Sequence, residues 1–327
     1  MSTEATARLE EIYAPIYKDL GRLEEFLQAR FHSEEPFLLQ LLEHIQKYRG
    51  KQIRPALLLL VARHTARSVT DDHVKIAGVI EIIHTATLVH DDILDDAALR
   101  HNVETLHRRW GERAGILLGD YLYSRAFALS TEVAGMAQVL SVATNTICEG
   151  ELLQIGSRFR PDLGEETYFE IIRKKTATLH AVACSLGGVL SGLRKTDVDR
   201  LHDFGMDLGV AFQIIDDCLD YSGQEAVVGK SLGTDLRQGK ATLPLIYLLE
   251  RLDPASAAEL IEALRHPLGP AVEARIARQV RETGAVADSM DRARAFIDSA
   301  RSRISGFDAD LRESLDQVAE YVISRRH

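Results

Sequence analysis

Two aspartate clusters with the same spacing are the residues of this chain best suited to chemistry. The first is Asp91-Asp92-Ile93-Leu94-Asp95, and the second is Asp216-Asp217-Cys218-Leu219-Asp220. In a helix, carboxylates at i and i+4 lie on one face, where like charges repel unless cations are near. Oxygen ligands without histidine or cysteine suit Mg²⁺, which Mn²⁺ can replace. The clusters therefore predict sites for several Mg²⁺ ions.

A diphosphate substrate fits such a pair of clusters. Mg²⁺ usually takes one or two protein carboxylates and shares the phosphate oxygens of a substrate. Two facing aspartate walls would hold several ions around one diphosphate. The plainer alternative is a solvated acidic helix end, since carboxylates are mostly exposed. Two clusters of identical spacing that both end apolar stretches make this alternative the weaker one.

Basic residues accompany both clusters in the sequence. Lys51 and Arg54 lie three residues apart where a helix is predicted to begin, and a helix start adds positive potential. Any one of these cations could be an ordinary surface side chain. Together they supply the positive charge that a metal and diphosphate site needs. The others are Arg100 after the first cluster, Lys175 in an otherwise apolar segment, and Lys230 and Lys240 around the loop after the second cluster.

The composition is that of an acidic globular protein. Among 327 residues, 39 are Lys or Arg and 49 are Asp or Glu, so the formal charge is −10. Such a chain is a poor nonspecific binder of nucleic acid, because phosphate contacts need a positive surface. The longest apolar run, Ala56–Ala62, is too short to span a bilayer, and the charged start is not that of a secretory signal. Cys148, Cys184 and Cys218 are far apart and favour reduced thiols in the cytoplasm.

Helical periodicity dominates the chain and predicts an all-α fold. Ile76, Val79, Ile80 and Ile83 recur at helical spacing in a stretch that is apolar nearly all round, as is the stretch 208–219. No sustained alternation marks a strand, and the glycine-containing segment 222–240 is expected to be a functional loop. We predict one domain over residues 1–327. Further helices are predicted over 5–30, 36–48, 52–67, 111–132, 136–157, 165–193, 241–251, 256–265, 270–282, 287–304 and 309–324.

Short motifs over residues 45–250 follow the order of one family. With them the sequence resembles the trans-prenyl diphosphate synthases, or polyprenyl synthetases, and their long-chain members in particular. The C-terminal residues match only as generic helices. The motifs are Gly50-Lys51-x-x-Arg54-Pro55, Glu81-x-x-His84-Thr85-Ala86-Thr87-Leu88-Val89-His90-Asp91-Asp92-x-x-Asp95, Gly119-Asp120-Tyr121-Leu122, Gly150-Glu151-x-x-Gln154, Lys175-Thr176-Ala177, Phe212-Gln213-x-x-Asp216-Asp217-x-x-Asp220, Gly229-Lys230 and Gly239-Lys240-x-Thr242-Leu243-Pro244.

The resemblance implies antiparallel helices around a deep central cavity, with both aspartate clusters at its mouth. It implies that isopentenyl diphosphate and an allylic diphosphate are joined head to tail, with release of pyrophosphate. It also assigns the metal ions to Asp91, Asp95 and Asp216, with Asp92 and Asp220 acting directly or through water and Asp217 as a further catalytic residue. The implied substrate contacts are Arg100, Lys175, Lys230 and Lys240 for the allylic diphosphate, Lys51, Arg54 and His84 for isopentenyl diphosphate, and Thr176 and Gln213 for the allylic cation.

One position departs from the family pattern. The family usually has two arginines and a glycine after the first cluster, whereas this chain has Arg100-His101-Asn102. A histidine can donate hydrogen bonds, and a neighbouring diphosphate favours its charged form. We predict that His101 binds isopentenyl diphosphate and that the affinity falls between about pH 6 and 8 as His101 loses its proton. The alternative is that Arg108 or Arg109 takes over the role.

The length of the product depends on side chains below Asp91. The family limits chain growth with bulky residues at the fifth position before that aspartate, where this chain has the small Ala86, next to Thr87. This resemblance predicts an open channel, a hexaprenyl to decaprenyl product, and a shorter product from Ala86→Phe. The residue that closes the channel could also be Tyr121, Tyr123 or Phe127.

Several other functions compete with this one. A short-chain synthase making geranylgeranyl or farnesyl diphosphate is the nearest alternative. A nonenzymatic subunit of a heteromeric synthase would tend to lose aspartates, and a terpene cyclase would mix Asn, Ser and Glu in its second metal motif. The pair Glu81-x-x-His84 matches half of a di-iron bundle signature, which needs a second pair and two more glutamates. The family resemblance also implies a homodimer.

Overall fold

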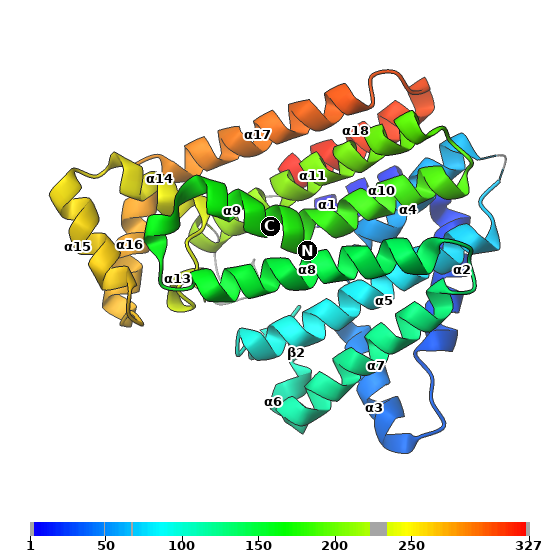
Figure 1. The fold of residues 1–327 in the computed structure, drawn as a ribbon, viewed down its shortest axis with the longest axis horizontal. Helices are drawn as coiled ribbons and strands as arrows, with labels where there is room; N and C mark the ends of the chain where they lie inside the picture. Colours follow the sequence, from blue (N-terminus) through cyan, green and yellow to red (C-terminus); the bar gives the residue numbers. More distant parts are fainter. Residues whose placement is uncertain (1–2, 49, 67, 223–233, 325–327) are drawn as a thin grey trace.

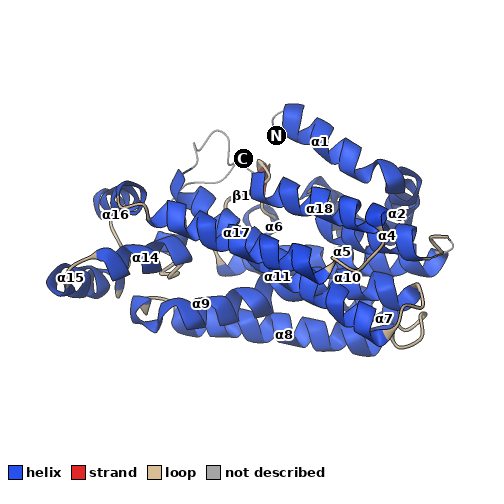
Figure 2. Cartoon of the chain, turned by 90° about the horizontal axis from the view of Figure 1, so that it is seen from above, coloured by secondary structure: helices blue, strands red, loops and turns tan. Residues whose placement is uncertain are grey.

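The chain folds into a bundle of helices (Figures 1 and 2). The computed structural model describes residues 3–48, 50–66, 68–222 and 234–324. The helices of the N-terminal half are α1 (Thr3–Tyr13), α2 (Tyr17–Arg30), α3 (Pro36–Ile45), α4 (Ile53–Thr65), α5 (Asp71–Leu94), α6 (Leu106–Trp110), α7 (Glu112–Ser130) and α8 (Met136–Ser157). Those of the C-terminal half are α9 (Gly164–Ile172), α10 (Thr178–Leu190), α11 (Lys195–Ser222), α13 (Thr234–Arg237), α14 (Leu243–Arg251), α15 (Pro254–Leu264), α16 (Pro270–Glu282), α17 (Ala285–Arg303) and α18 (Ala309–Ser324).

The most apolar helices form the centre of the bundle. Helix α10 packs against α4, α5 and α11, and α11 packs in turn against α17. Helices α4 and α10 are buried along most of their length because apolar side chains cover nearly all their faces. A smaller apolar cluster holds α14, α15 and α16 together at one end of the molecule (Figure 1). The arrangement leaves α5 and α11 with their C-terminal ends at the same cavity.

The all-α prediction is confirmed. The apolar stretch around Ile76 lies in α5 and the stretch 208–219 lies in α11, and both are buried where the periodicity predicts. The predicted helix 136–157 has the bounds of α8. Two predicted helices are interrupted: 5–30 by a 3₁₀ turn at Ala14–Ile16, which contains Pro15, and 165–193 by a π-helical segment at Arg173–Ala177. No helix in the described part of the chain is long and apolar enough to cross a membrane.

Among the described residues, strands occur only in one short hairpin. Strands β1 (Leu99–Arg100) and β2 (Val103–Glu104) pair antiparallel. Their two-residue turn places His101 at φ 48° and Asn102 at φ 63°. Asparagine tolerates this left-handed conformation better than most residues, so Asn102 can stand where glycine would otherwise be favoured. The sequence did not predict these strands, because two-residue strands are too short to show alternation.

Candidate active site

A cavity of about 1680 Å³ opens between the C-terminal ends of α5 and α11. Residues of α4, α5, α8, α9, α11, the hairpin and the segment 234–242 line it. Its lining includes every aspartate of the two clusters except the buried Asp92, and most of the cations predicted from the sequence. Lys230 is the exception, because it lies outside the described residues.

Both clusters lie where a helix repels negative charge. Asp91 and Asp92 are in the last turn of α5 and Asp95 directly follows it, while the second cluster ends α11. The C-terminal end of a helix carries partial negative charge, so it destabilises nearby carboxylates. Neither last turn contains a basic residue of its own. The compensating cations must therefore come from other elements across the cavity.

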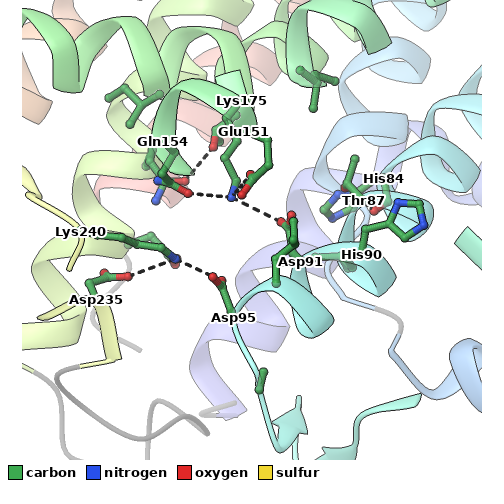
Figure 3. A pocket seen from close by; sticks show the side chains of 18 of the residues that line it. His84, Thr87, His90, Asp91, Asp95, Glu151, Gln154, Lys175, Asp235 and Lys240 are labelled. Atoms are coloured by element: carbon green, nitrogen blue, oxygen red, sulfur yellow. Dashed lines mark hydrogen bonds and ion pairs between the residues drawn. The ribbon is translucent and has the colours of Figure 1, made fainter. Parts of the chain in front are cut away.

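Lys175 provides one of these cations. It reaches across from the π-helical segment, with its Nζ 3.7 Å from Asp91 Oδ2, and it also pairs with Glu151 of α8 (Figure 3). Its Nζ donates a hydrogen bond to Gln154 Oε1 at 3.0 Å. Burial lowers the pKa of Lys175, but the two carboxylates outweigh it and the net shift is upward. Lys175 therefore stays charged at the wall opposite α5.

Asp95 is held from the opposite side as well. Lys240 Nζ lies 3.1 Å from Asp95 Oδ2 and 3.7 Å from Asp235 Oδ1 (Figure 3). Arg158 Nη2 lies 2.9 Å from Asp95 Oδ1, and Gln238 Nε2 donates to the Asp95 carbonyl oxygen at 2.9 Å. These contacts come from Arg158, which directly follows α8, and from the segment after α13, so three parts of the chain meet at Asp95.

Asp92 is structurally distinct from the other residues of the first cluster. It is buried, and its Oδ1 accepts a hydrogen bond from Arg100 Nε at 2.9 Å. Burial raises the pKa of Asp92, and the neighbouring Arg100 opposes that shift. Arg100 itself lies in strand β1, so the hairpin carries the cation that the buried carboxylate needs. The pair fixes the hairpin to the end of α5.

The second cluster also divides its roles. Asp216 and Asp220 line the cavity and are partly exposed, and Asp220 Oδ2 accepts a hydrogen bond from the Asp235 backbone amide at 3.2 Å. Asp217 is buried and accepts hydrogen bonds from Tyr168 Oη at 2.6 Å and Gln213 Nε2 at 2.7 Å. Burial raises the pKa of Asp217 well above its usual range, with Asp235 adding to the shift.

Two glycines allow neighbouring helices to pack closely against the π-helical segment that carries Lys175 and Thr176. A Cβ on Gly150 of α8 would lie 2.6 Å from the Lys175 backbone nitrogen. A Cβ on Gly209 of α11 would lie 2.5 Å from the Ala177 Cα. Neither helix could approach so closely with a larger residue. The close packing presents both functional side chains of the segment to the cavity, as π-helical turns often do at functional sites.

The residues implied for isopentenyl diphosphate gather at another side of the cavity. Lys51, Arg54, His84 and His101 all line it. Arg54 Nη1 lies 3.0 Å from His84 Nε2, and arginine is only a donor, so His84 accepts this hydrogen bond. Burial and Arg54 keep the pKa of His84 well below its usual range. His101 Nδ1 lies 2.9 Å from the Tyr48 carbonyl oxygen.

The two chain-length positions have different surroundings. Thr87 lines the cavity (Figure 3), whereas Ala86 is fully buried and is not among the lining residues. Of the three candidates for closing the channel, Tyr123 lines the cavity, and Tyr121 and Phe127 do not. A larger side chain at position 86 would therefore reach the cavity only by displacing its neighbours. The chain-length role of both positions stays a prediction.

The walls offer carboxylate oxygens to a metal ion. Among the residues that the structure describes, no group of three acidic, histidine or cysteine side chains could hold a metal ion by itself. The ammonium groups of Lys175 and Lys240 now lie against Asp91 and Asp95 and balance their charge. A Mg²⁺ ion needs only one or two protein carboxylates when it shares substrate phosphate oxygens, so this donor set fits it.

A di-iron centre does not fit the same residues. The chain does contain a second Glu-x-x-His, Glu104 to His107. Glu104 lies in strand β2, outside any helix, so this pair cannot project from one helix into a bundle core as the di-iron signature requires.

Sequence reasoning missed several residues at the site. Arg158 follows Glu151 by seven residues and Gln154 by four, a helical spacing that could have revealed it, although α8 itself ends at Ser157. Tyr168 precedes Lys175 by the same seven residues. Asp235 and Gln238 follow the residues that the structure does not describe, and their sequence gives no such signal.

Comparison with known proteins identifies the family. The family model for polyprenyl synthetase matches residues 35–280. The chain is 35% identical over 325 residues to octaprenyl diphosphate synthase of Escherichia coli, covering 97% of this chain and 99% of that protein. The chain belongs to the polyprenyl synthetase family. It is therefore a prenyltransferase that makes a trans-polyprenyl diphosphate.

Other relatives extend the comparison. The structure of a polyprenyl synthase from Caulobacter crescentus CB15, complexed with calcium and isoprenyl diphosphate, is similar to this one with a TM-score of 0.93 and 34% identity, covering 98% of each chain. A short chain isoprenyl diphosphate synthase of Methanothermobacter thermautotrophicus is 35% identical over 300 residues, covering 89% of this chain and 91% of that protein. The relatives of this chain thus include enzymes named for long products and enzymes named for short products.

Proposed function

We propose that this polyprenyl synthetase condenses isopentenyl diphosphate with an allylic diphosphate in a reaction that depends on Mg²⁺. The observation that carries the proposal is the pair of aspartate clusters, which lie at helix ends that repel them and face one cavity, where Lys175 and Lys240 pair with the first cluster. The complex of the Caulobacter crescentus relative with calcium and isoprenyl diphosphate supports a divalent ion beside a diphosphate. Asp91, Asp95, Asp216 and Asp220 would hold Mg²⁺.

The allylic diphosphate would be bound by cations that now pair with carboxylates. Mg²⁺, when bound, neutralises phosphate charge and stabilises the departing pyrophosphate. Lys175 and Lys240 exchange their ion pairs with Asp91 and Asp95 for phosphate oxygens, assisted by Arg100 and Lys230. Charge-assisted hydrogen bonds of this kind strengthen as the leaving group gains charge, so they favour cleavage of the carbon–oxygen bond.

The remaining steps use oxygen dipoles and a second cationic subsite. The Thr176 hydroxyl and the Gln213 carbonyl, whose oxygens lie 2.9 Å apart, stabilise the allylic cation. Lys51, Arg54, His84 and His101 hold isopentenyl diphosphate so that its double bond attacks that cation. We assign the proton lost in the last step to the departing pyrophosphate. The two products are free pyrophosphate and an allylic diphosphate whose chain is longer by one isoprene unit.

We propose a hexaprenyl to decaprenyl product. Relatives that are 35% identical include an octaprenyl and a short chain synthase, so overall similarity leaves the length open. The small Thr87 in the lining and Ala86 behind it favour the longer product, because neither position carries a bulky side chain. A geranylgeranyl or farnesyl product is the alternative if Tyr123 closes the cavity early.

We also propose a homodimer in the cytoplasm. Large apolar side chains are exposed on the neighbouring helices α7 and α8, and contiguous patches of this kind commonly mark interaction sites. The three cysteines form no disulfide, which favours a reducing compartment. The exposed apolar residues are Ile116 and Leu117 of α7 and Val139, Val142, Leu152 and Ile155 of α8, and we call them the α7–α8 face.

Metal dependence can be tested by titration with Mg²⁺ after chelation. We expect the chelated enzyme to be inactive and Mg²⁺ to restore turnover. Asp216→Asn should raise the Mg²⁺ concentration needed for half-maximal activity by about tenfold, because the loss of a residue that holds a metal ion commonly weakens metal affinity by at least this much. Asp199→Asn, an exposed residue of the same helix, is the matched control and should leave the titration unchanged. Full activity in the presence of chelator would contradict the proposal.

A further inference from the structure

A chain of hydrogen bonds runs through the cavity wall behind the second aspartate cluster. Tyr168 Oη donates to Asp217 Oδ2 at 2.6 Å, and Gln213 Nε2 donates to Asp217 Oδ1 at 2.7 Å. The Thr176 hydroxyl then donates to Gln213 Oε1 at 2.9 Å. Tyr168 and Asp217 are each only 5% exposed. These hydrogen bonds join α9, α11 and the π-helical segment.

These hydrogen bonds fix which way the Gln213 amide points. Asp217 Oδ1 accepts a hydrogen bond from the Gln213 NH₂ group, so that group faces Asp217. The carbonyl oxygen of Gln213 is then turned toward Thr176 and the cavity. Both oxygens of Asp217 already accept hydrogen bonds from protein donors, whereas Asp216 and Asp220 are partly exposed in the cavity.

We propose that Tyr168 is a positioning residue for the condensation reaction. Through Asp217 it holds the Gln213 amide with its carbonyl dipole directed at the place where the allylic cation forms. Asp217 thus serves the orientation of Gln213, and the metal ions of the second cluster are left to Asp216 and Asp220. The inference rests on the proposed function, because only a cationic intermediate gives the dipole direction its importance.

The sign of the dipole explains why a buried anchor is needed. A glutamine amide has two ends of opposite partial charge and nearly identical shape. If Gln213 flips, it presents its NH₂ group to the cation and destabilises the state it should stabilise. Dipoles that are fixed before the reaction cost no reorganisation when charge develops. Tyr168 prevents Asp217 from rotating away, so the orientation of Gln213 is set in advance.

The first test is Tyr168→Phe, which removes the hydroxyl and keeps the ring. We expect the single-turnover rate of the first condensation to fall by about tenfold, the effect of one lost hydrogen bond. The dissociation constant of the allylic diphosphate should stay unchanged. Single turnover is used because product release can hide the chemical step. The matched control is Tyr247→Phe, whose hydroxyl donates to Glu165 of α9 at 3.0 Å outside the cavity lining.

A double-mutant cycle separates positioning from general packing. In a Gln213→Ala background, Tyr168→Phe should cause no further loss of rate, because there is no amide left to orient. The same tenfold loss in both backgrounds would overturn the proposal, as would an unchanged rate in Tyr168→Phe alone. A weaker allylic diphosphate affinity with an unchanged rate would also overturn it.

A second variant keeps the proposal testable if Tyr168→Phe lowers the melting temperature. Asp217→Asn has nearly the same shape but carries an NH₂ donor, so it no longer dictates the amide direction. It should lower the single-turnover rate in the wild-type background and not in the Gln213→Ala background. An inactive wild-type enzyme in the same assay would contradict the proposed function itself, whereas an active wild type with additive variants would contradict only this inference.

Discussion

At the scale of residues, the site is built from carboxylates that the protein places in unfavourable positions and then balances with cations. Asp91 and Asp95 lie at the end of α5, where the helix repels them, and Lys175, Lys240 and Arg158 compensate from other elements. The same cations are suited to bind phosphate once metal ions take over the carboxylates. The balance explains why charges of both signs can gather around one cavity.

The replacement at His101 gives a prediction about pH. The Tyr48 carbonyl can only accept, so the neutral ring of His101 carries its proton on Nδ1, and Nε2 gains one only when the ring is charged. The charged form is present at low pH, so the Michaelis constant for isopentenyl diphosphate should rise between about pH 6 and 8. His101→Arg keeps the charge and should remove this rise. Titration of the diphosphate itself affects both proteins, so the ratio of their constants isolates His101.

A ratio that is constant over this pH range would refute the role of His101. The structural control is His32→Arg, because His32 does not line the cavity. The ratio of its Michaelis constant to that of the wild type should not change with pH.

Residue types and spacing were enough to predict much of the site, and burial explains what they missed. The aspartates, Lys175, Arg54 and Gln213 carry motifs that can be read from the chain, and all of them except the buried Asp92 line the cavity. Tyr168 is almost fully buried in the wall and acts through Asp217, so it belongs to no motif with its own chemical signature. The surroundings of Ala86 also needed the structure, since a residue can lie next to the lining in sequence and still be buried behind it.

At the scale of elements, the π-helical segment between α9 and α10 matters most. Periodicity predicts one helix over 165–193, yet a π-helical segment at Arg173–Ala177 divides it and carries Lys175 and Thr176. Local sequence does not specify this change, because it depends on the close approach of α8 and α11. The glycines that allow that approach, Gly150 and Gly209, lie far away in the sequence.

Gly209→Ala tests this role of the packing. The added methyl group would lie 2.5 Å from the Ala177 Cα, so we expect a loss of about 1–3 kcal/mol in the free energy of unfolding. The single-turnover rate should fall as well, because Thr176 and Lys175 move with the segment. Denaturant unfolding and single-turnover assays measure the two effects.

The control is Gly21→Ala in α2, where nothing lies within 4 Å of the added methyl group. Alanine is the better helix former by about 1 kcal/mol, so this variant should be as stable as the wild type or more stable. A Gly209→Ala enzyme with wild-type stability and rate would show that the close approach of α11 does not position the segment.

At the scale of the whole molecule, the α7–α8 face predicts how copies of the chain associate. Leu117 is 67% exposed and Leu152 is 69% exposed, and large exposed apolar patches mark interaction surfaces. We expect light scattering to give the mass of a dimer and Leu117→Glu to weaken the dimer, because association would bury an unpaired charge. Val189→Glu, an exposed valine of α10, should leave the mass unchanged. A monomeric wild type at micromolar concentration would contradict the proposal.

The most direct measurement of the central claim is a product analysis. The purified enzyme is incubated with labelled isopentenyl diphosphate, Mg²⁺ and farnesyl diphosphate, and the products are resolved by chain length. We predict a ladder of intermediates that ends between hexaprenyl and decaprenyl diphosphate. A single geranylgeranyl product would contradict the open channel past Thr87, and the absence of any elongated product from a folded enzyme would contradict the proposed reaction.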